Sequence, residues 1–299
     1  MYITNIKEYL TAHKNQQIRS GKSGAKVWEI EDKYILKYVQ KAELPDQKVF
    51  TLYQNEAYFY QFFERDSHKK RLSCLPETLD IQVSDYEILI LMKKYQELSK
   101  EQIGEELLQK IIRVLAIIHS QEIPGFLKPE QKQPEYLEET QIKGCLAGWQ
   151  SVLAEHPGKF DEGILIKAAE KINEIIEFHH AEEQVLSHGD FHWDNLLQAE
   201  NGDIIVCDWQ GAGVGGASGD IGFFLSRLKA DGVNIEPRKV IELYCYERFL
   251  LTGKNISSEK LQMYIKAANF IVSFQCWHQY LHGSSYERVR GIYEEMVMD

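Results

Sequence analysis

The chain has 299 residues, enough for one or two domains with a sizeable core. Its 34 Lys and Arg against 45 Asp and Glu give a net charge of −11, so nucleic acid is not expected as a partner. The five cysteines are scattered without a CxxC pair, which predicts reduced thiols in a cytoplasmic protein. We expect neither secretion nor membrane insertion, because there is no signal-peptide core and no apolar run near the roughly 20 residues of a membrane helix.

Residues 1–95 are predicted to be rich in strands. The stretch AKVWEIEDKYILKYV (25–39) has the pattern of a hairpin with EDK as its turn, and YEILILMKK (86–94) is rich in β-forming residues. One helix is expected between them, in FTLYQNEAYFYQFFERD (50–66), where apolar residues recur at helical spacing. This part carries 15 Lys and Arg against 13 Asp and Glu, a net charge of +2.

Helices are expected to dominate residues 96–299, which carry a net charge of −13. One strand pair is predicted at 195–208, where Asn201–Gly202 favours a two-residue hairpin turn. The charged run EFHHAEEQ (177–184) is interpreted as a solvated helix end, with His179 and His180 at the surface. The helices themselves are predicted at about 104–120, 135–155, 162–180, 220–230, 236–251 and 257–282.

The most informative stretch is LSHGDFHWDNLL (186–197). His188 and His192 are four residues apart, which suits two zinc ligands on a helix, but Gly189 between them disfavours a helix and no third ligand has a recognisable spacing. A polar turn before a strand is a second interpretation. A catalytic loop is the third, and it depends on the order of the residues.

Phosphoryl transfer needs one carboxylate as base and an amide plus a second carboxylate on magnesium. Asp190, Asn195 and Asp208 follow one another in this order, with Asp208 at the end of the predicted strand pair. His188 is interpreted as a structural brace of the loop. His192 and Asp194 are polar loop residues or face the acceptor.

The N-terminal part supplies candidates for the other half of such a site. Lys37 alternates with apolar neighbours in YILKYV, where it could reach nucleotide phosphates. Glu56 on the following helix is placed to pair with it, and the small-residue turn in SGKSGAKVWEI (20–30) could cover the phosphates. Each feature alone is weak, whereas the ordered set points to a kinase.

These motifs resemble those of the aminoglycoside phosphotransferase and choline kinase-like family, which is related to the protein kinases. HGDFHWDN followed by VCDW is similar to its catalytic motif, SGKSGAKVWEI to its nucleotide loop, IIRVLAIIHS to its core helix, and SGDIGFFLSR to its Gly-Asp segment. The match spans roughly residues 18–230. Trp193–Asp194 depart from the small residues that the family often has, so acceptor contacts are not carried over.

The resemblance implies a bilobal, protein-kinase-like α+β fold, with a small β-rich N-terminal lobe (1–95) and a larger, mainly helical lobe (96–299). It implies ATP or GTP as phosphate donor, Mg²⁺, and a small molecule with a hydroxyl as acceptor. Asp220 would brace the catalytic loop. By position, the site would comprise Asp190 as base, Asn195 and Asp208 as magnesium ligands, Lys37 and Glu56 as the phosphate-positioning pair, Ser23 and Gly24 in the nucleotide loop, and Met92, Lys93, Lys94 and Tyr95 as the link that holds the base.

Four alternative interpretations compete with a small-molecule kinase. A protein kinase is disfavoured because only eleven residues separate Asp208 from Asp220, without an activation segment of the usual length. SGKS lacks the first glycine of a P-loop. GAGVGG (211–216) satisfies GxGxxG, so a dinucleotide-binding oxidoreductase competes, although no second parallel strand is predicted. An inactive kinase-like binding module is the non-enzyme alternative.

The acceptor is the least defined part of the prediction. The acidic C-terminal part favours a cationic molecule such as an aminosugar or an amino alcohol, since a cleft of one charge concentrates ligands of the opposite charge. The aromatic residues of FIVSFQCWHQYLHG (270–283) could form a wall of its site or belong to the core.

Overall fold

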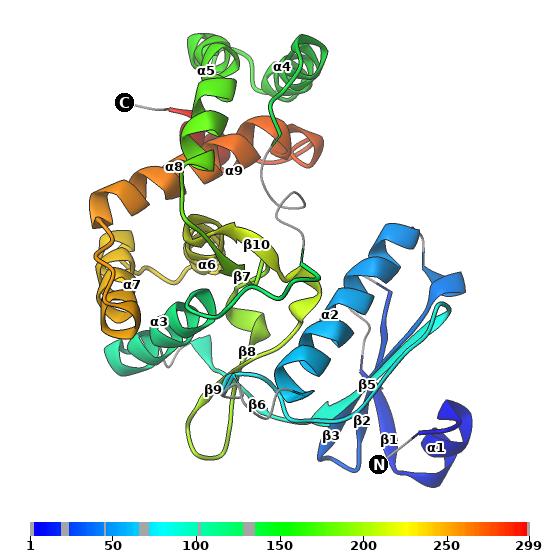
Figure 1. Cartoon of the computed structure of the whole chain (residues 1–299). Helices are drawn as coiled ribbons and strands as arrows, with labels where there is room; N and C mark the ends of the chain where they lie inside the picture. Colours follow the sequence, from blue (N-terminus) through cyan, green and yellow to red (C-terminus); the bar gives the residue numbers. More distant parts are fainter. Residues whose placement is uncertain are drawn as a thin grey trace.

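The computed structural model describes residues 3–18, 24–44, 46–65, 72–100, 103–127 and 135–297. A twisted antiparallel sheet with one long helix forms the N-terminal lobe, and a stack of helices forms most of the rest (Figure 1). The sheet order is β1-β2-β3-β5-β4. Its strands are β1 (Asn15–Ile18), β2 (Lys26–Ile30), β3 (Tyr34–Gln40), β4 (Thr78–Val83) and β5 (Glu87–Lys93).

The predicted hairpin is confirmed, with β2 and β3 paired antiparallel across the turn Glu31–Lys33. Glu31 and Asp32 both have positive φ angles, of 54° and 57°, as a tight hairpin turn requires. Lys37 lies in the middle of β3 and is paired with Val27 on β2 and Ile90 on β5. Its position in the sheet is therefore fixed from both sides.

The two faces of this sheet are covered by different elements. Helix α2 (Gln47–Arg65) packs on the face that carries Val39, Ile90 and Met92, and Lys37 lies on this face because side chains alternate along a strand (Figure 1). The short helix α1 (Ile6–Ala12) and Ile3 cover the opposite face. Lys37 and α2 thus meet on one side of the sheet.

Short strands join the lobes and frame the central loop. β6 (Gln96–Glu97) pairs with β8 (Leu196–Gln198), which pairs with β9 (Ile204–Val206). β7 (Gln184–Ser187) and β10 (Gly213–Gly216) form a separate antiparallel pair. The segment 188–195 between β7 and β8 is therefore held at both ends by strands.

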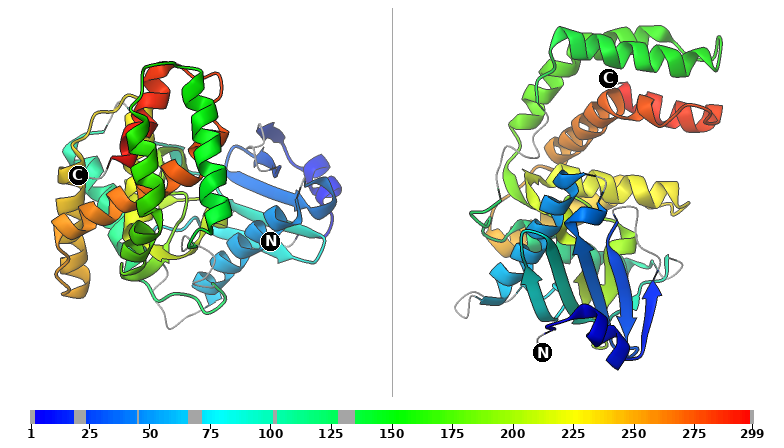
Figure 2. Two further views of the ribbon diagram at one scale, coloured as in Figure 1. Left: turned by 90° about the horizontal axis from the view of Figure 1, so that it is seen from above. Right: turned by 90° about the vertical axis from the view of Figure 1, so that its right-hand side faces the viewer.

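The helices of the C-terminal lobe stack outward from this centre (Figure 2). One core spans both lobes, whereas a second is formed among α4, α5, α8 and α9. None of the described helices combines the length and the apolar character needed to cross a bilayer. The helices are α3 (Glu105–His119), α4 (Glu139–Ala154), α5 (Glu162–His180), α6 (Ala217–Ala230), α7 (Pro237–Thr252), α8 (Ser258–Gln275) and α9 (Tyr286–Tyr293).

Some boundaries differ from the prediction. The helix expected at 257–282 ends at Gln275, where the chain turns before a 3₁₀ segment, and the one expected from 135 begins at Glu139. The prediction of a two-residue turn at Asn201–Gly202 is wrong, because β8 and β9 are shorter than expected and a loop from Ala199 to Asp203 joins them. Only Gly202 takes a positive φ there, of 84°. The elements α1, β4, β6, β7, β10 and α9 are not among the predicted ones.

Candidate active site

The catalytic-loop candidate, residues 188–195, brings Asp190 and Asn195 together. The side-chain amide of Asn195 donates to the backbone carbonyl of Asp190 at 2.9 Å and to its Oδ2 at 3.2 Å. A 3₁₀ turn, Trp193–Asn195, makes this possible by folding the chain back onto Asp190. Asn195 is buried, while Asp190 keeps 35% of its side chain exposed, so its carboxylate can meet a ligand.

Asp190 is held in its ionised form. Burial alone would raise the pKa of its carboxyl, but the nearby His192 ring and the Asn195 amide lower the pKa below its usual value. His192 Nε2 lies 3.6 Å from Asp190 Oδ2. A carboxylate that is ionised, partly exposed and fixed in place is suited to accept a proton.

Asp208 faces this loop from the end of β9 and is bound to the N-terminal lobe. Lys37 Nζ donates to Asp208 Oδ1 at 2.8 Å and to Glu56 Oε2 on α2 at 2.7 Å. Asp208 has a left-handed backbone, with φ 62° and ψ 59°, which is uncommon outside glycine and is often found at functional sites. One ammonium therefore joins carboxylates from both lobes.

The charges of this triad depend on one another. Burial alone would lower the pKa of Lys37, but the charges of Glu56 and Asp208 raise it above its usual value. Burial raises the pKa of Glu56, whose side chain is 1% exposed, and the Lys37 charge opposes that rise. Phe59 of α2 also stacks on Trp209 at 4.2 Å, which adds apolar contact between the lobes beside Asp208.

His188 and Asp220 brace the loop from behind. His188 Nε2 donates to the carbonyl of Cys207 at 3.0 Å, and its Nδ1 accepts from the backbone N–H of Asp190 at 3.3 Å. Both ring nitrogens are thus used within the fold, as the structural interpretation of His188 expects. Asp220, in the first turn of α6, accepts the backbone N–H groups of His188 and Gly189, each at 2.8 Å.

Sequence reasoning assigned no role to His119 and misjudged Glu182. His119 ends α3 and is fully buried, with Nε2 3.0 Å from Asp220 Oδ2. Glu182, expected in a solvated helix end, is only 6% exposed and accepts the backbone N–H of Ser218 at 2.9 Å. His179 is also mostly covered and contacts the Ser218 hydroxyl, so the surface prediction is wrong for these two side chains. Glu177, Glu183 and Gln184 of the same segment are exposed, as predicted. The only signal for His119 was its place at the end of the motif IIRVLAIIHS.

Trp193 and Asp194 lie at the side of the loop. Trp193 is buried and donates from Nε1 to the carbonyl of Leu98, in the segment that joins the lobes. Asp194 is half-exposed and pairs with Lys100 and Arg227, each at 3.2 Å. Both contacts hold the loop against its neighbours.

The predicted link, Met92–Tyr95, runs from the end of β5 toward β6. The side chains of Lys93 and Lys94 approach Glu200 at 3.9 Å and Glu29 at 2.6 Å, so they point to surface carboxylates. Met92 is buried in the core, and the Tyr95 hydroxyl accepts the N–H of Glu77. Gly24 has a φ of 88°, which favours glycine in a tight loop, and Ser23 lies outside the described residues.

Asn195 and Asp208 offer an amide and a carboxylate, the oxygen ligands that Mg²⁺ prefers. The backbone N–H of Cys207, next to Asp208, donates to the Asn195 carbonyl at 3.0 Å, which keeps the two residues side by side. The described residues contain no group of three His, Cys, Asp or Glu placed for a metal. The two ring nitrogens of His188 are already bound, which argues against zinc at this loop.

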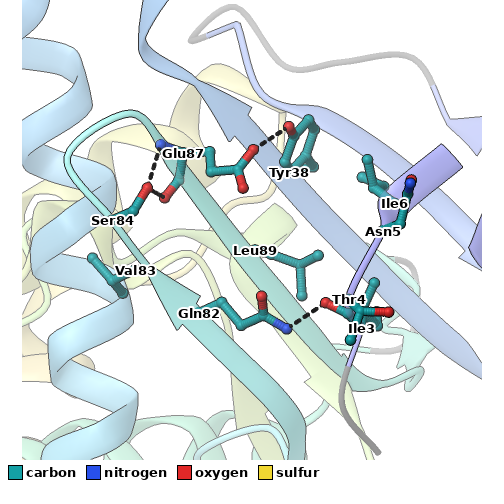
Figure 3. Close-up of a pocket in the computed structure, with 10 residues that line it drawn as sticks. All are labelled: Ile3, Thr4, Asn5, Ile6, Tyr38, Gln82, Val83, Ser84, Glu87 and Leu89. Atoms are coloured by element: carbon teal, nitrogen blue, oxygen red, sulfur yellow. Dashed lines mark hydrogen bonds between the residues drawn. The ribbon is translucent and has the colours of Figure 1, made fainter.

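Two other features lie apart from this cluster. GAGVGG begins at the last residue of the 3₁₀ turn Trp209–Gly211 and continues into β10, which is antiparallel to β7. A dinucleotide fold needs parallel strands. A hollow of about 410 Å³ lies on the sheet face opposite Lys37, beside Tyr38, Gln82 and Glu87 (Figure 3). Polar groups that line it bind one another, since the Tyr38 hydroxyl donates to Glu87 Oε2 at 2.6 Å.

The aromatic residues at 270–283 divide between core and surface. Phe270 and Phe274 are buried in the second core, as the core interpretation expects. Trp277 is half-buried and Tyr280 is 69% exposed. These four residues therefore do not form a single aromatic wall.

The family model described as the phosphotransferase enzyme family matches residues 14–247. No curated protein matches the chain. Among solved structures, the ADP-bound aminoglycoside phosphotransferase APH(2'')-Ib is 17% identical with a TM-score of 0.54, covering 97% of this chain and 95% of that one. Ethanolamine kinase from Plasmodium vivax is 13% identical with a TM-score of 0.60, covering 98% and 82%.

Choline kinase LicA from Streptococcus pneumoniae is 14% identical, with a TM-score of 0.56 and 97% of both chains covered. At these identities the likeness concerns the fold, and it confirms the predicted kinase-like architecture of a β-rich N-terminal lobe and a helical C-terminal lobe. The family match extends over more than half of the chain, from β1 through most of α7. The chain therefore belongs to the phosphotransferase enzyme family.

Proposed function

We propose that this enzyme transfers the γ-phosphate of ATP to a hydroxyl group of a small molecule, with Asp190 as the base. One observation carries the proposal: Lys37 reaches across the lobes to Asp208 at 2.8 Å, beside the loop that presents Asp190. A phosphate-binding cation, two oxygen ligands and a partly exposed carboxylate at one place form the set that phosphoryl transfer requires. GTP is the alternative donor.

The proposed roles follow from the contacts. Asp190 Oδ accepts the proton of the acceptor hydroxyl as that oxygen attacks the γ-phosphorus, while the bond from this phosphorus to the β–γ bridging oxygen breaks and ADP leaves. Lys37 turns its ammonium toward the phosphates while Glu56 keeps it in place from behind at 2.7 Å. Asn195 and Asp208 would hold Mg²⁺, which supplies positive charge to the phosphate oxygens. This division assigns nucleotide binding to residues 1–95 and acceptor binding to residues 96–299.

The acceptor is proposed to be cationic. Residues 96–299 carry a net charge of −13, and acidic clefts concentrate cations. The solved structures named above are kinases of aminoglycosides, ethanolamine and choline, all of which carry amino or ammonium groups. We also propose a cytoplasmic location, because ATP is available there.

The test is a screen for ADP release with ATP, Mg²⁺ and a panel of aminoglycosides, amino alcohols, neutral sugars and nucleosides. Asp190→Asn should lower turnover on the best acceptor by at least about 100-fold, since it removes the base. Asp203→Asn, in the exposed loop between β8 and β9, is the matched control and should retain activity. ATP binding without transfer to any acceptor would support an inactive binding module instead.

A further inference from the structure

A buried chain of hydrogen bonds runs from α7 to the residue before Asp190. The Tyr244 hydroxyl lies 2.7 Å from His119 Nδ1, and His119 Nε2 lies 3.0 Å from Asp220 Oδ2. These three side chains are almost completely buried. Asp220 in turn accepts the backbone N–H of Gly189, which directly precedes Asp190.

The direction of each hydrogen bond follows from the partners. Backbone N–H groups can only donate, so the two oxygens of Asp220 act as acceptors toward His188 and Gly189. The contact of His119 Nε2 with the same carboxylate therefore places a proton on Nε2. In the neutral ring Nδ1 is then an acceptor, and the Tyr244 hydroxyl donates to it.

We propose that Tyr244 is a positioning residue for the proposed base, Asp190. Its hydroxyl fixes the tautomer and the orientation of His119, which keeps Nε2–H directed at Asp220 and so keeps the amides at 188 and 189 in place. This inference rests on the proposed function, because it assumes that the location of the Asp190 carboxylate limits turnover. A misplacement of a catalytic group by about 1 Å can cost on the order of 100-fold in rate.

α7 also contacts the backbone at the end of α3 through a second side chain. Arg248, one helical turn after Tyr244, is 3% exposed and donates from Nη1 to the carbonyl of His119 at 2.9 Å and to Ser120 Oγ at 2.7 Å. Tyr244 holds the imidazole and Arg248 holds the backbone of the same residue. α7 thus fixes the end of α3 from which His119 reaches Asp220.

Loss of the Tyr244 hydroxyl has a specific consequence. A phenylalanine fills nearly the same volume, so the packing of α7 on α3 is retained. His119 Nδ1 would then be buried without a donor, and the imidazole would be held at Nε2 alone. The ring orientation would be less well fixed, so Nε2–H would no longer be kept in line with the Asp220 carboxylate, which would weaken the hydrogen bonds that position the loop.

The experiment compares Tyr244→Phe with Tyr264→Phe. Tyr264 is also buried, and its hydroxyl donates to the carbonyl of Ala181 at 3.0 Å, outside this chain of bonds. Tyr244→Phe should lower kcat by about 10-fold while the Kd for ATP changes by less than about two-fold, as losses of supporting hydrogen bonds do. Tyr264→Phe should keep kcat within about two-fold of the original value.

Two further measurements separate this inference from the proposed function. In a double-mutant cycle, Tyr244→Phe should add little to His119→Gln, because the hydroxyl acts only through the imidazole. Imidazole ¹⁵N shifts should show the Nε2–H tautomer of His119 in the wild type, whether or not an acceptor has been found. A loss of kcat in Tyr264→Phe equal to that in Tyr244→Phe, additive effects in the cycle, or an Nδ1–H tautomer would each overturn the inference. If Asp190→Asn instead turned over as fast as the wild type, the proposed function would be refuted.

Discussion

The two halves of the site are held by different forces. On the nucleotide side, one ammonium, Lys37, joins Glu56 and Asp208 through ion pairs that cross the lobes. On the catalytic side, the backbone at 188 and 189 is bound by hydrogen bonds to the single carboxylate of Asp220. Under the proposed function, charges on phosphate and metal would replace the partners of Lys37 and Asp208 when a nucleotide binds. The proposed base, Asp190, would in contrast have to be in place before the acceptor binds.

The largest expected effect on stability concerns the nucleotide side. Lys37→Met removes the counter-charge of Glu56, which is 1% exposed, and should lower the free energy of unfolding by about 3–5 kcal/mol. Glu56→Gln in addition should recover part of the loss, because no charge is then left buried. Chemical denaturation of the single and double variants measures both effects.

Lys26 on the neighbouring strand is the matched control. Its pair with Glu43 is exposed, and Lys26→Met should cost no more than about 1 kcal/mol. Equal losses in the free energy of unfolding in Lys26→Met and Lys37→Met would show that the buried ion pair of Lys37 and Glu56 contributes no more to stability than an exposed one.

A smaller effect, on the catalytic side, depends on pH. Burial raises the pKa of Glu182 to about 7, although hydrogen bonds from Ser218 oppose the rise. Because the pKa is higher in the folded than in the unfolded protein, the protonated carboxyl of Glu182 contributes to the free energy of unfolding. This contribution is fully present below the unfolded pKa and is lost as the pH rises through about 7. The free energy of unfolding of Glu182→Gln minus that of the wild type should therefore increase by about 3 kcal/mol from pH 4 to pH 8.

The control for this change is the adjacent residue. Glu183 is half-exposed and pairs with Lys254, so Glu183→Gln removes a carboxylate from the same segment without removing a buried one. If the two variants show the same dependence on pH, burial of the Glu182 carboxyl is not its cause.

The smallest effect concerns the acceptor. If acidic residues attract a cationic acceptor, its KM should rise a few-fold with added salt, because the screening length falls to roughly 3 Å at 1 M. Steady-state kinetics at several salt concentrations, with the KM for ATP measured in parallel, gives the comparison. A neutral acceptor, or a KM that is indifferent to salt, would contradict the proposal of a cationic acceptor and leave the kinase assignment intact.

Local patterns predicted most of the elements that carry the site. The helix at 162–180 and the hairpin around Glu31–Lys33 have strong periodic signals, and the structure confirms both. β10 was missed because GVGG has no alternation and few β-forming residues, and the strand exists only through its pairing with β7. The helix was expected to reach residue 282 because the helical pattern of apolar residues continues past Gln275. In the structure the helix ends at Gln275, and a 3₁₀ turn follows.

The ordered motif was enough to bring Lys37, Glu56 and Asp208 together as candidates, and Lys37 contacts Glu56 as expected. The contact of Lys37 with Asp208 was not predicted. The roles of Glu182 and His119 could not be predicted, because each depends on a partner more than 30 residues away, Ser218 and Asp220. Burial of a polar side chain depends on what packs over it, and a linear pattern does not contain that information. These supporting residues are therefore where the structure adds most.

The most direct test of the account compares the two aspartates of the site. The affinity for Mg²⁺–ATP, measured by calorimetry, should fall by more than about 10-fold in Asp208→Asn, since a carboxylate ligand of a hard cation has no good neutral replacement. In Asp190→Asn it should stay within about three-fold of the wild type, because this residue is proposed to face the acceptor. Equal losses of affinity in the two variants, or a larger loss in Asp190→Asn, would contradict the division of the site into a nucleotide side and a base side.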